Sequence, residues 1–112
     1  MLPYSLIKFY LASIASALDY LHSESLIYRN LSSRNILISI SGYLLLVDLS
    51  CAKMINSQAK TTTLIGNPYY SAPEMISKGG YSFSVDIWAL GVILYEMITG
   101  NLPFGNGLSN PL

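Results

Sequence analysis

The chain has 112 residues, enough for one small domain or a piece of a larger one, and only 11% of them are charged, where about 25% is usual. Six basic and six acidic side chains give a net charge of zero, which offers no argument for nucleic acid or an anionic membrane as a partner. Cys51 is the only cysteine, so an intrachain disulfide is excluded, and because the first residues lack the features of a secretion signal we expect a cytoplasmic protein.

The first predicted element is an amphipathic helix that begins near Pro3 and ends near His22-Ser23. Its apolar residues recur every three or four positions and form one stripe, whereas polar residues occupy much of the remaining surface. The pattern is that of an ordinary packing helix, which carries no chemistry of its own. The stripe comprises Leu6, Ile7, Tyr10, Leu11, Ile14, Leu18 and Leu21.

A polar loop, residues 28–35, follows the helix and lies between two short apolar runs. Its second flank, Ile36-Leu37-Ile38, is separated by a serine–glycine turn from another apolar strand, residues 43–47. If these two strands pair as a hairpin, Asn35 and Asp48 lie at its open end. An amide oxygen and a carboxylate brought together there are ligands of the kind that Mg²⁺ takes, which indicates phosphate chemistry.

The segment from Cys51 to Gly66 shows no hydrophobic period, so we predict a flexible loop. It contains Thr61-Thr62-Thr63, and threonine-rich loops of this kind are usually just solvated. Residues 72–76 then predict a short helical turn.

The last predicted element is a helix from Val85 to about Thr99, with Ser84 as its N-cap and Gly100 at its end. Nearly every face of this helix is apolar, which is typical of a helix in the middle of a domain. Its most apolar part, residues 87–98, is too short to span a bilayer.

Three short motifs make the chain resemble the protein kinases. Residues Tyr28 to Asn35 resemble the catalytic loop, whose pattern is H-R-D-L-x-x-x-N. Asp48-Leu49-Ser50 resembles the D-F-G element, and Ala72-Pro73-Glu74 matches the A-P-E element in the right order and at the right distance. Residues Ser84 to Gly91 complete the match, which extends from about residue 2 to residue 104.

Within this family the chain is most similar to the cyclic-nucleotide-dependent, AGC-type serine/threonine kinases. The reasons are Tyr28, where most kinases have His, and Gly66-Asn67-Pro68-Tyr69-Tyr70. The resemblance implies a mainly α fold with a small β-hairpin, the partial C-terminal lobe of a kinase. Residues 1–112 would form a partial kinase domain, from the catalytic loop through the central buried helix, with the N-terminal lobe and the last helices absent. It also implies structural roles for Glu74 and Asp86.

The resemblance assigns the candidate site as well. ATP and magnesium are the implied cofactors, and Asn35 and Asp48 stand where the family holds two magnesium ions. Asn30 replaces the Asp that accepts the proton of the substrate hydroxyl, which an amide cannot do at neutral pH. Ser32 replaces a Lys that stabilises the transferring phosphate, and it brings no charge. Ser50 replaces a Gly and lacks its freedom to adopt positive φ.

A regulatory phosphorylation site is also implied, at Thr63. Arg29 and Lys53 match the family positions that bind the phosphate on this threonine. Phosphothreonine carries up to about two negative charges, which such cations pair with well. The alternative, a solvated loop without a regulatory role, stays open.

Three interpretations of function remain. The chain is a catalytically impaired piece of an ATP-dependent serine/threonine protein kinase, or a pseudokinase that acts as a binding or allosteric module, which Asn30, Ser32 and Ser50 favour, or a truncated product without function. Its partners would be a protein substrate or a partner kinase, and a missing lobe or an oligomeric partner would be needed. Residues 31–35 are also similar to the tyrosine-kinase loop, which weakens the assignment of substrate class. We expect no phosphotransferase activity from the isolated chain.

Overall fold

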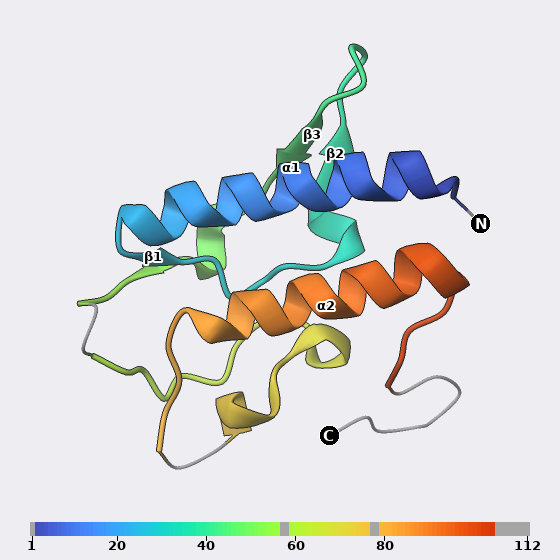
Figure 1. Cartoon of the computed structure of the whole chain (residues 1–112). Coiled ribbons are helices and arrows are strands. Elements are labelled where there is room, and N and C mark those ends of the chain that lie inside the picture. Colours follow the sequence, from blue (N-terminus) through green and yellow to red (C-terminus); the bar gives the residue numbers. More distant parts are fainter. Residues whose placement is uncertain (1, 57–58, 77–78, 105–112) are drawn as a thin grey trace.

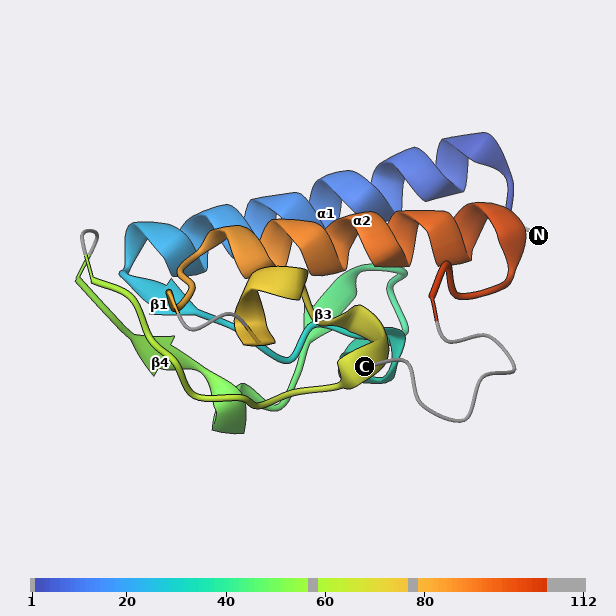
Figure 2. The same cartoon turned by 90° about the horizontal axis from the view of Figure 1, so that it is seen from below.

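The computed structural model describes residues 2–56, 59–76 and 79–104. Within these ranges two α-helices, α1 (Tyr4–Ser23) and α2 (Ser84–Thr99), lie side by side and run in opposite directions (Figures 1 and 2). In Figure 2 the strands and turns that connect them follow one side of this helix pair. The described part of the fold thus has two helices and small antiparallel sheets, where the sequence predicts a mainly α fold with one small hairpin.

The strands are short and form two separate antiparallel pairs. The predicted hairpin is present, with Ile36 opposite Leu46, and the N–H of Val47 donates to the Asn35 carbonyl at 3.0 Å, which extends the pairing by one step. The second pair, β1 with β4, was not expected from the sequence. The strands are β1 (Leu26–Ile27), β2 (Ile36–Ile38), β3 (Leu44–Leu46) and β4 (Lys53–Met54).

The main core lies between the two helices and the polar loop. The stripe of α1 buries Ile14 and Leu18, and α2 presents Val92 and Ile93 to the same core. Each fully buried side chain of this size contributes about 1.5–3 kcal/mol relative to exposure. The remaining buried members are Leu21, Tyr28, Leu31, Tyr70 and Ala89. Because Tyr28 and Leu31 belong to the loop itself, helix packing fixes the loop.

The start of α2 differs from the sequence prediction. Phe83, not Ser84, occupies the N-cap position, and no side chain caps the helix there. The N–H of Val85 donates to Ser82 O at 3.3 Å and that of Asp86 to Phe83 O at 3.0 Å, so a preceding turn satisfies these amides and Ser84 falls inside the helix. Gly100 ends α2 as predicted, in the left-handed region at φ 78°.

The loop predicted from Cys51 to Gly66 includes residues 57 and 58, which lie outside the described residues, and its described parts contain more regular structure than expected. It contains β4, and Thr61 forms an isolated antiparallel bridge with Tyr81. Burial explains both contacts, since Ile55 after β4 is 7% exposed and Thr61 is 4% exposed.

Short 3₁₀ turns make up much of the remaining connections. The turn over residues 73–76 corresponds to the short helical turn that the sequence predicts over residues 72–76. In the ranges that the structure describes, these turns are Ser33–Asn35, Leu49–Cys51, Pro68–Tyr70 and Pro73–Ile76.

One face of α2 is buried and the opposite face is not. Val85, Ala89 and Val92 pack inward, whereas Ile87 and Ile98 are exposed. The sequence predicts a helix in the middle of a domain. Within the part of the chain that the structure describes, only one face of α2 is covered by protein. No helix in that part is both long and apolar enough to cross a membrane.

Candidate functional site

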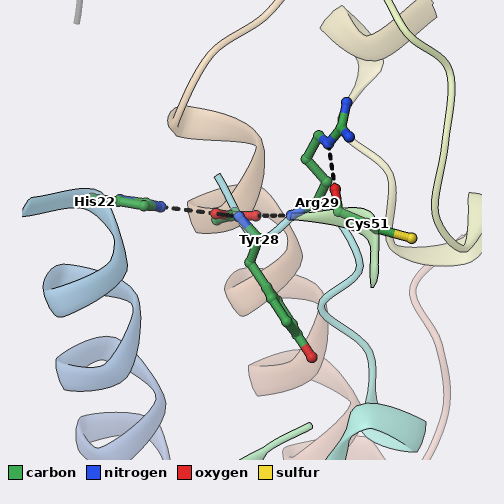
Figure 3. A network of polar contacts seen from close by, with 5 residues as sticks. His22, Tyr28, Arg29 and Cys51 are labelled. Atoms are coloured by element: carbon green, nitrogen blue, oxygen red, sulfur yellow. Dashed lines mark hydrogen bonds and ion pairs between the residues drawn. The ribbon is translucent and has the colours of Figure 1, made fainter. Parts of the chain in front are cut away.

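The polar loop is held at its start by the carboxylate of Asp86, which is 1% exposed (Figure 3). Its Oδ2 accepts the N–H of Tyr28 at 2.8 Å, and its Oδ1 accepts the N–H of Arg29 at 2.9 Å. Nε2 of His22, at the end of α1, lies 2.8 Å from Oδ2. We call these four residues the loop frame. One side chain of α2 therefore joins α1 to the loop, in the first turn of a helix, where a negative charge is favourable.

Tyr28 ties the same loop to the end of β3. Its ring is fully buried, and its hydroxyl donates to the carbonyl of Val47, the residue before Asp48. Burial, followed by the negative charges of Asp48, Asp86 and Cys51, raises the pKa of Tyr28 from 10.0 to about 12. The hydroxyl is therefore a neutral donor at physiological pH, and it fixes the distance between the loop and the strand that carries Asp48.

Asn30 and Ser32 line an open cleft of about 490 Å³ between the loop and residues 66–69. Asn30 is half-buried and Ser32 is 2% exposed. The other lining residues are Arg34, Asn35, Gly66, Asn67, Pro68 and Tyr69. The lining of this cleft is partly polar and partly apolar, and it includes two of the positions at which the sequence departs from the kinase pattern.

Gly66 lets the far wall of the cleft approach the loop. Its φ is +93°, and a Cβ at this position would lie 2.4 Å from the carbonyl oxygen of Arg29. Only glycine tolerates both the backbone angle and the contact. Asn67 then caps the next turn, since its Oδ1 accepts the N–H of Tyr69 at 3.0 Å.

Asn35 and Asp48 lie at the open end of the β2–β3 hairpin, one residue before β2 and two after β3. Nδ2 of Asn35 donates to the carbonyl of Asn30 at 2.7 Å, so the amide is oriented by the loop. The carboxylate of Asp48 accepts both the hydroxyl and the N–H of Ser50, which together lower the pKa of Asp48. Both residues thus present a fixed oxygen-bearing group.

The donor chemistry of this pair fits a divalent cation such as Mg²⁺. An amide oxygen and an ionised carboxylate are hard ligands, and the remaining positions on Mg²⁺ are commonly filled by water and phosphate. Among the described residues there is no group of three or more His, Cys, Asp or Glu side chains that would suit a different metal. In the segment Asp48-Leu49-Ser50, the residue with positive φ is Asp48, at 63°. Ser50 does not have positive φ, so replacing the family's glycine with serine does not strain the backbone there.

Arg29, Lys53 and the threonine segment meet in a second polar cluster. Nε of Arg29 donates to the Cys51 carbonyl at 2.7 Å, and its Nη1 lies 3.3 Å from the hydroxyl of Tyr81. That hydroxyl donates to the carbonyl of Thr63, whose side chain is exposed. Sequence reasoning missed Tyr81, because a tyrosine seven residues after the A-P-E motif carries no signal that it returns to the loop.

Lys53 also belongs to this cluster, although its side-chain hydrogen bond goes to Thr61 and not to Thr63. Its Nζ donates to Oγ1 of Thr61 at 3.0 Å. The structure therefore brings Arg29, Lys53 and residues 61–63 to one place and leaves the hydroxyl of Thr63 outside their hydrogen bonds.

A further network, which the sequence did not reveal, joins the cleft to α2. The hydroxyl of Tyr70 donates to Oε1 of Glu96 at 2.7 Å and lies 3.0 Å from Oγ of Ser33. Burial raises the pKa of Tyr70. Glu74, in contrast, makes no hydrogen bond or ion pair within the described ranges, so its structural role stays a prediction.

Some known proteins are similar to this chain over its whole length. The model of the family described as protein kinase domain matches residues 1–111. The chain is 49% identical over 112 residues to a cGMP-dependent protein kinase of Plasmodium berghei (strain Anka), a match that covers 100% of this chain and 13% of the relative. It is 46% identical over 112 residues to that of Toxoplasma gondii, covering 100% of this chain and 11% of the relative.

A third similar protein is human cGMP-dependent protein kinase 2, which is 50% identical over 97 residues. That match covers 87% of this chain and 13% of the human protein. The chain thus spans 11–13% of the length of these three relatives. The two matches over 112 residues include the loop, the hairpin and both helices of the structure.

Proposed function

Because the chain belongs to the protein kinase family, with cGMP-dependent protein kinases among its relatives, we propose that it is part of a serine/threonine-type kinase domain whose phosphoryl transfer is impaired. The proposed part is the C-terminal lobe, from the catalytic loop through α2. The observation that carries this proposal is Asn30 in the cleft beside Ser32. The loop frame is intact, while the group that should accept a proton is an amide.

The chemical consequence follows from the side chains. Phosphoryl transfer depends on positioning and on neutralising charge, and the loop residue at position 30 accepts the proton of the attacking hydroxyl in the family. Asn30 can donate or accept a hydrogen bond, but it has no basic site at neutral pH. Loss of such a base costs roughly 10²–10⁴ in rate. Ser32 adds no charge to offset this loss.

The residues that would hold a magnesium ion with ATP are retained. Asn35 and Asp48 would bind the metal, and the metal would supply neutralisation of phosphate charge. In this chain Asn30 orients the Asn35 amide and Ser50 orients the Asp48 carboxylate. Binding of a nucleotide without efficient transfer is therefore the behaviour we propose.

A second candidate function is that of a pseudokinase binding or allosteric module. It is favoured by the combination of an intact loop frame with an amide at position 30. Asp86 accepts the N–H groups of two loop residues and contacts His22, although Asn30 lacks the basic group. A loop frame of this kind keeps a surface for a protein substrate or a partner kinase. In this case restoring the acid at position 30 would not create activity.

We also propose that Thr63 is a phosphorylation site used by another kinase. Arg29 and Lys53 lie in the cluster that holds residues 61–63, and both are cations within reach of this segment. A phosphate there would form charge-assisted hydrogen bonds with them. The phosphate would then add hydrogen bonds to a cluster that is already formed in its absence.

The experiment compares Asn30→Asp with the parent in the longest form of the protein that its source makes. Transfer of labelled phosphate from ATP to a serine-containing protein is measured with magnesium, and Asn101→Asp serves as the control on an exposed turn. We expect Asn30→Asp to raise the rate by roughly 10²–10⁴. A parent that is already as active as the variant would exclude impairment, and an inactive variant that still binds ATP would favour the pseudokinase role.

A further inference from the structure

Arg34 is the only charged residue among the eight described residues that line the cleft beside Asn30. It lies in the 3₁₀ turn Ser33–Asn35 and is exposed. Within the described ranges its guanidinium makes no hydrogen bond and no ion pair. The turn that carries it is fixed, because the N–H of Asn35 donates to Ser32 O at 3.0 Å and its side chain donates to Asn30 O at 2.7 Å.

No Asp or Glu is among the described residues that line the cleft, and three acidic residues elsewhere in the fold accept hydrogen bonds from other groups. Glu96 accepts the hydroxyl of Tyr70, and Asp86 is buried with the backbone of the loop. Asp48 accepts the hydroxyl and N–H of Ser50 and does not line the cleft. The cleft therefore has one positive charge, on the exposed side chain of Arg34, and no acidic residue among its described lining residues.

The other lining groups suit a polypeptide ligand. Asn30 and Asn67 offer amides for hydrogen bonds, while Pro68 and Tyr69 provide an apolar wall. A volume of about 490 Å³ accommodates several side chains, and its open shape admits a chain from outside. A guanidinium presents a planar fork that matches an oxyanion in a bidentate manner, which an ammonium does not.

We propose that this cleft binds a peptide segment whose hydroxyl-bearing residue is flanked by an oxyanion, and that Arg34 binds this oxyanion. The oxyanion is a carboxylate or a phosphate carried by the peptide. The proposal rests on the proposed function, since it names the class of protein segment that the cleft beside Asn30 accepts. A segment flanked by lysine or arginine is disfavoured, because the wall has no acidic group to receive it.

The experiment measures binding without nucleotide or metal, so it does not depend on phosphate transfer. Three fluorescein-labelled peptides of equal length carry one central serine flanked on both sides by glutamate, by phosphoserine or by lysine. Anisotropy is recorded with the 112-residue chain at ionic strengths of about 0.1 M and about 1 M. We expect the glutamate peptide to bind about tenfold more tightly than the lysine peptide, as a charge-assisted bidentate pair would give, with the difference reduced at high salt.

The variant Arg34→Glu should reverse the order of the glutamate and lysine peptides, and Arg34→Lys should keep the order with a smaller difference. Lys8→Glu, on the exposed face of α1, changes the net charge equally and should leave the order unchanged. Cooperative melting followed by Trp88 fluorescence checks that each variant is folded. Tighter binding of the phosphoserine peptide identifies phosphate as the preferred oxyanion.

Several results would overturn the proposal. They are an unchanged order in Arg34→Glu, the same reversal in Lys8→Glu, or no binding of any peptide by the folded chain. None of these bears on Asn30 or on ATP, whereas failure of the Asn30→Asp experiment leaves the peptide order intact. The two hypotheses are therefore separable.

Discussion

The backbone N–H of Arg29 donates to Oδ1 of Asp86 at 2.9 Å, although 57 residues separate the two in the sequence. Arg29 has φ 67°, in the left-handed region, where a residue with a side chain is strained by roughly 1–3 kcal/mol. The hydrogen bond to the carboxylate holds this conformation and so sets the direction in which Asn30 leaves the loop frame. A buried carboxylate on α2 thus determines the shape of a loop that is far from it in the sequence.

Replacement of Asp86 by Ala should lower the free energy of unfolding by about 3 kcal/mol or more. The change leaves the N–H groups of Tyr28 and Arg29 buried without acceptors, at roughly 1–3 kcal/mol each. Urea denaturation measures the loss. Asp19→Asn, on the exposed side of α1, is the control and should change stability by less than about 0.5 kcal/mol. Equal effects of the two variants would mean that the loop frame does not depend on Asp86.

Two glycines with the same backbone angle give a matched pair of variants. Gly42, at φ +92°, has no atom within 4 Å of the place where a Cβ would lie, so Gly42→Ala should cost only about 1–2 kcal/mol for the left-handed backbone. Gly66→Ala should cost about 1–3 kcal/mol more, because its Cβ would meet the carbonyl of Arg29 at 2.4 Å. Thermal or urea unfolding measures the loss of unfolding free energy in each variant. Equal losses in the two variants would contradict the close contact at Gly66.

The sequence predicts local structure well and the long-range contacts poorly. The hairpin follows from a turn at Ser41-Gly42 between apolar strands, and α1 follows from its 3.6-residue period. By contrast, β1 has two residues, Leu26–Ile27, and its partner β4 lies in a stretch without a period. Such a pair is stabilised by burial of Ile27 and Ile55, which only the assembled fold provides.

The candidate site shows the same division. The kinase-like motifs identified Asn30, Asn35 and Asp48, and the hairpin register places the last two at one end of β2–β3. Two other features of the site could not be predicted from the motifs. They are the hydrogen bond from Tyr81 to Thr63 and the charge of Arg34, which has no ionic partner in the described residues. They arise from chain segments that meet only after folding, so the spacing of residues along the chain does not identify them.

Alkaline pH should destabilise the fold through Tyr28. The pKa of Tyr28 is raised from 10.0 in the unfolded chain to about 12, so the folded state keeps its proton where the unfolded state releases it. This contribution is fully present below about pH 10 and is lost as the pH rises toward about 12. Unfolding free energy followed over this interval should fall less steeply in Tyr28→Phe than in the parent. Tyr20→Phe, which changes an exposed tyrosine, should retain the parent slope.

Phosphorylation of Thr63 should protect residues 59–66 from limited proteolysis. The phosphate would bind Arg29 and Lys53, which already lie in the cluster that holds Thr61 and Tyr81. Cleavage of the phosphorylated chain should slow by about fivefold, as for one charge-assisted contact of roughly 1 kcal/mol, and should recover in Arg29→Ala and in Lys53→Ala. Lys60→Ala, a nearby exposed cation, is the control. If phosphorylation leaves the cleavage rate unaltered, the pairing is wrong.

The exposed face of α2 should make the 112-residue chain associate and bind hydrophobic dye. Ile87 and Ile98 are 56% and 47% exposed and lie on one face, since eleven residues make about three helical turns. Contiguous apolar surface of this kind is typical of interfaces and of association. Replacing both by Lys should lower dye binding and shift gel filtration toward the monomer, with little change in unfolding free energy. Ile93→Lys, at a position 2% exposed, should instead unfold the chain, and a double variant that elutes and binds dye like the parent would exclude this face as the cause.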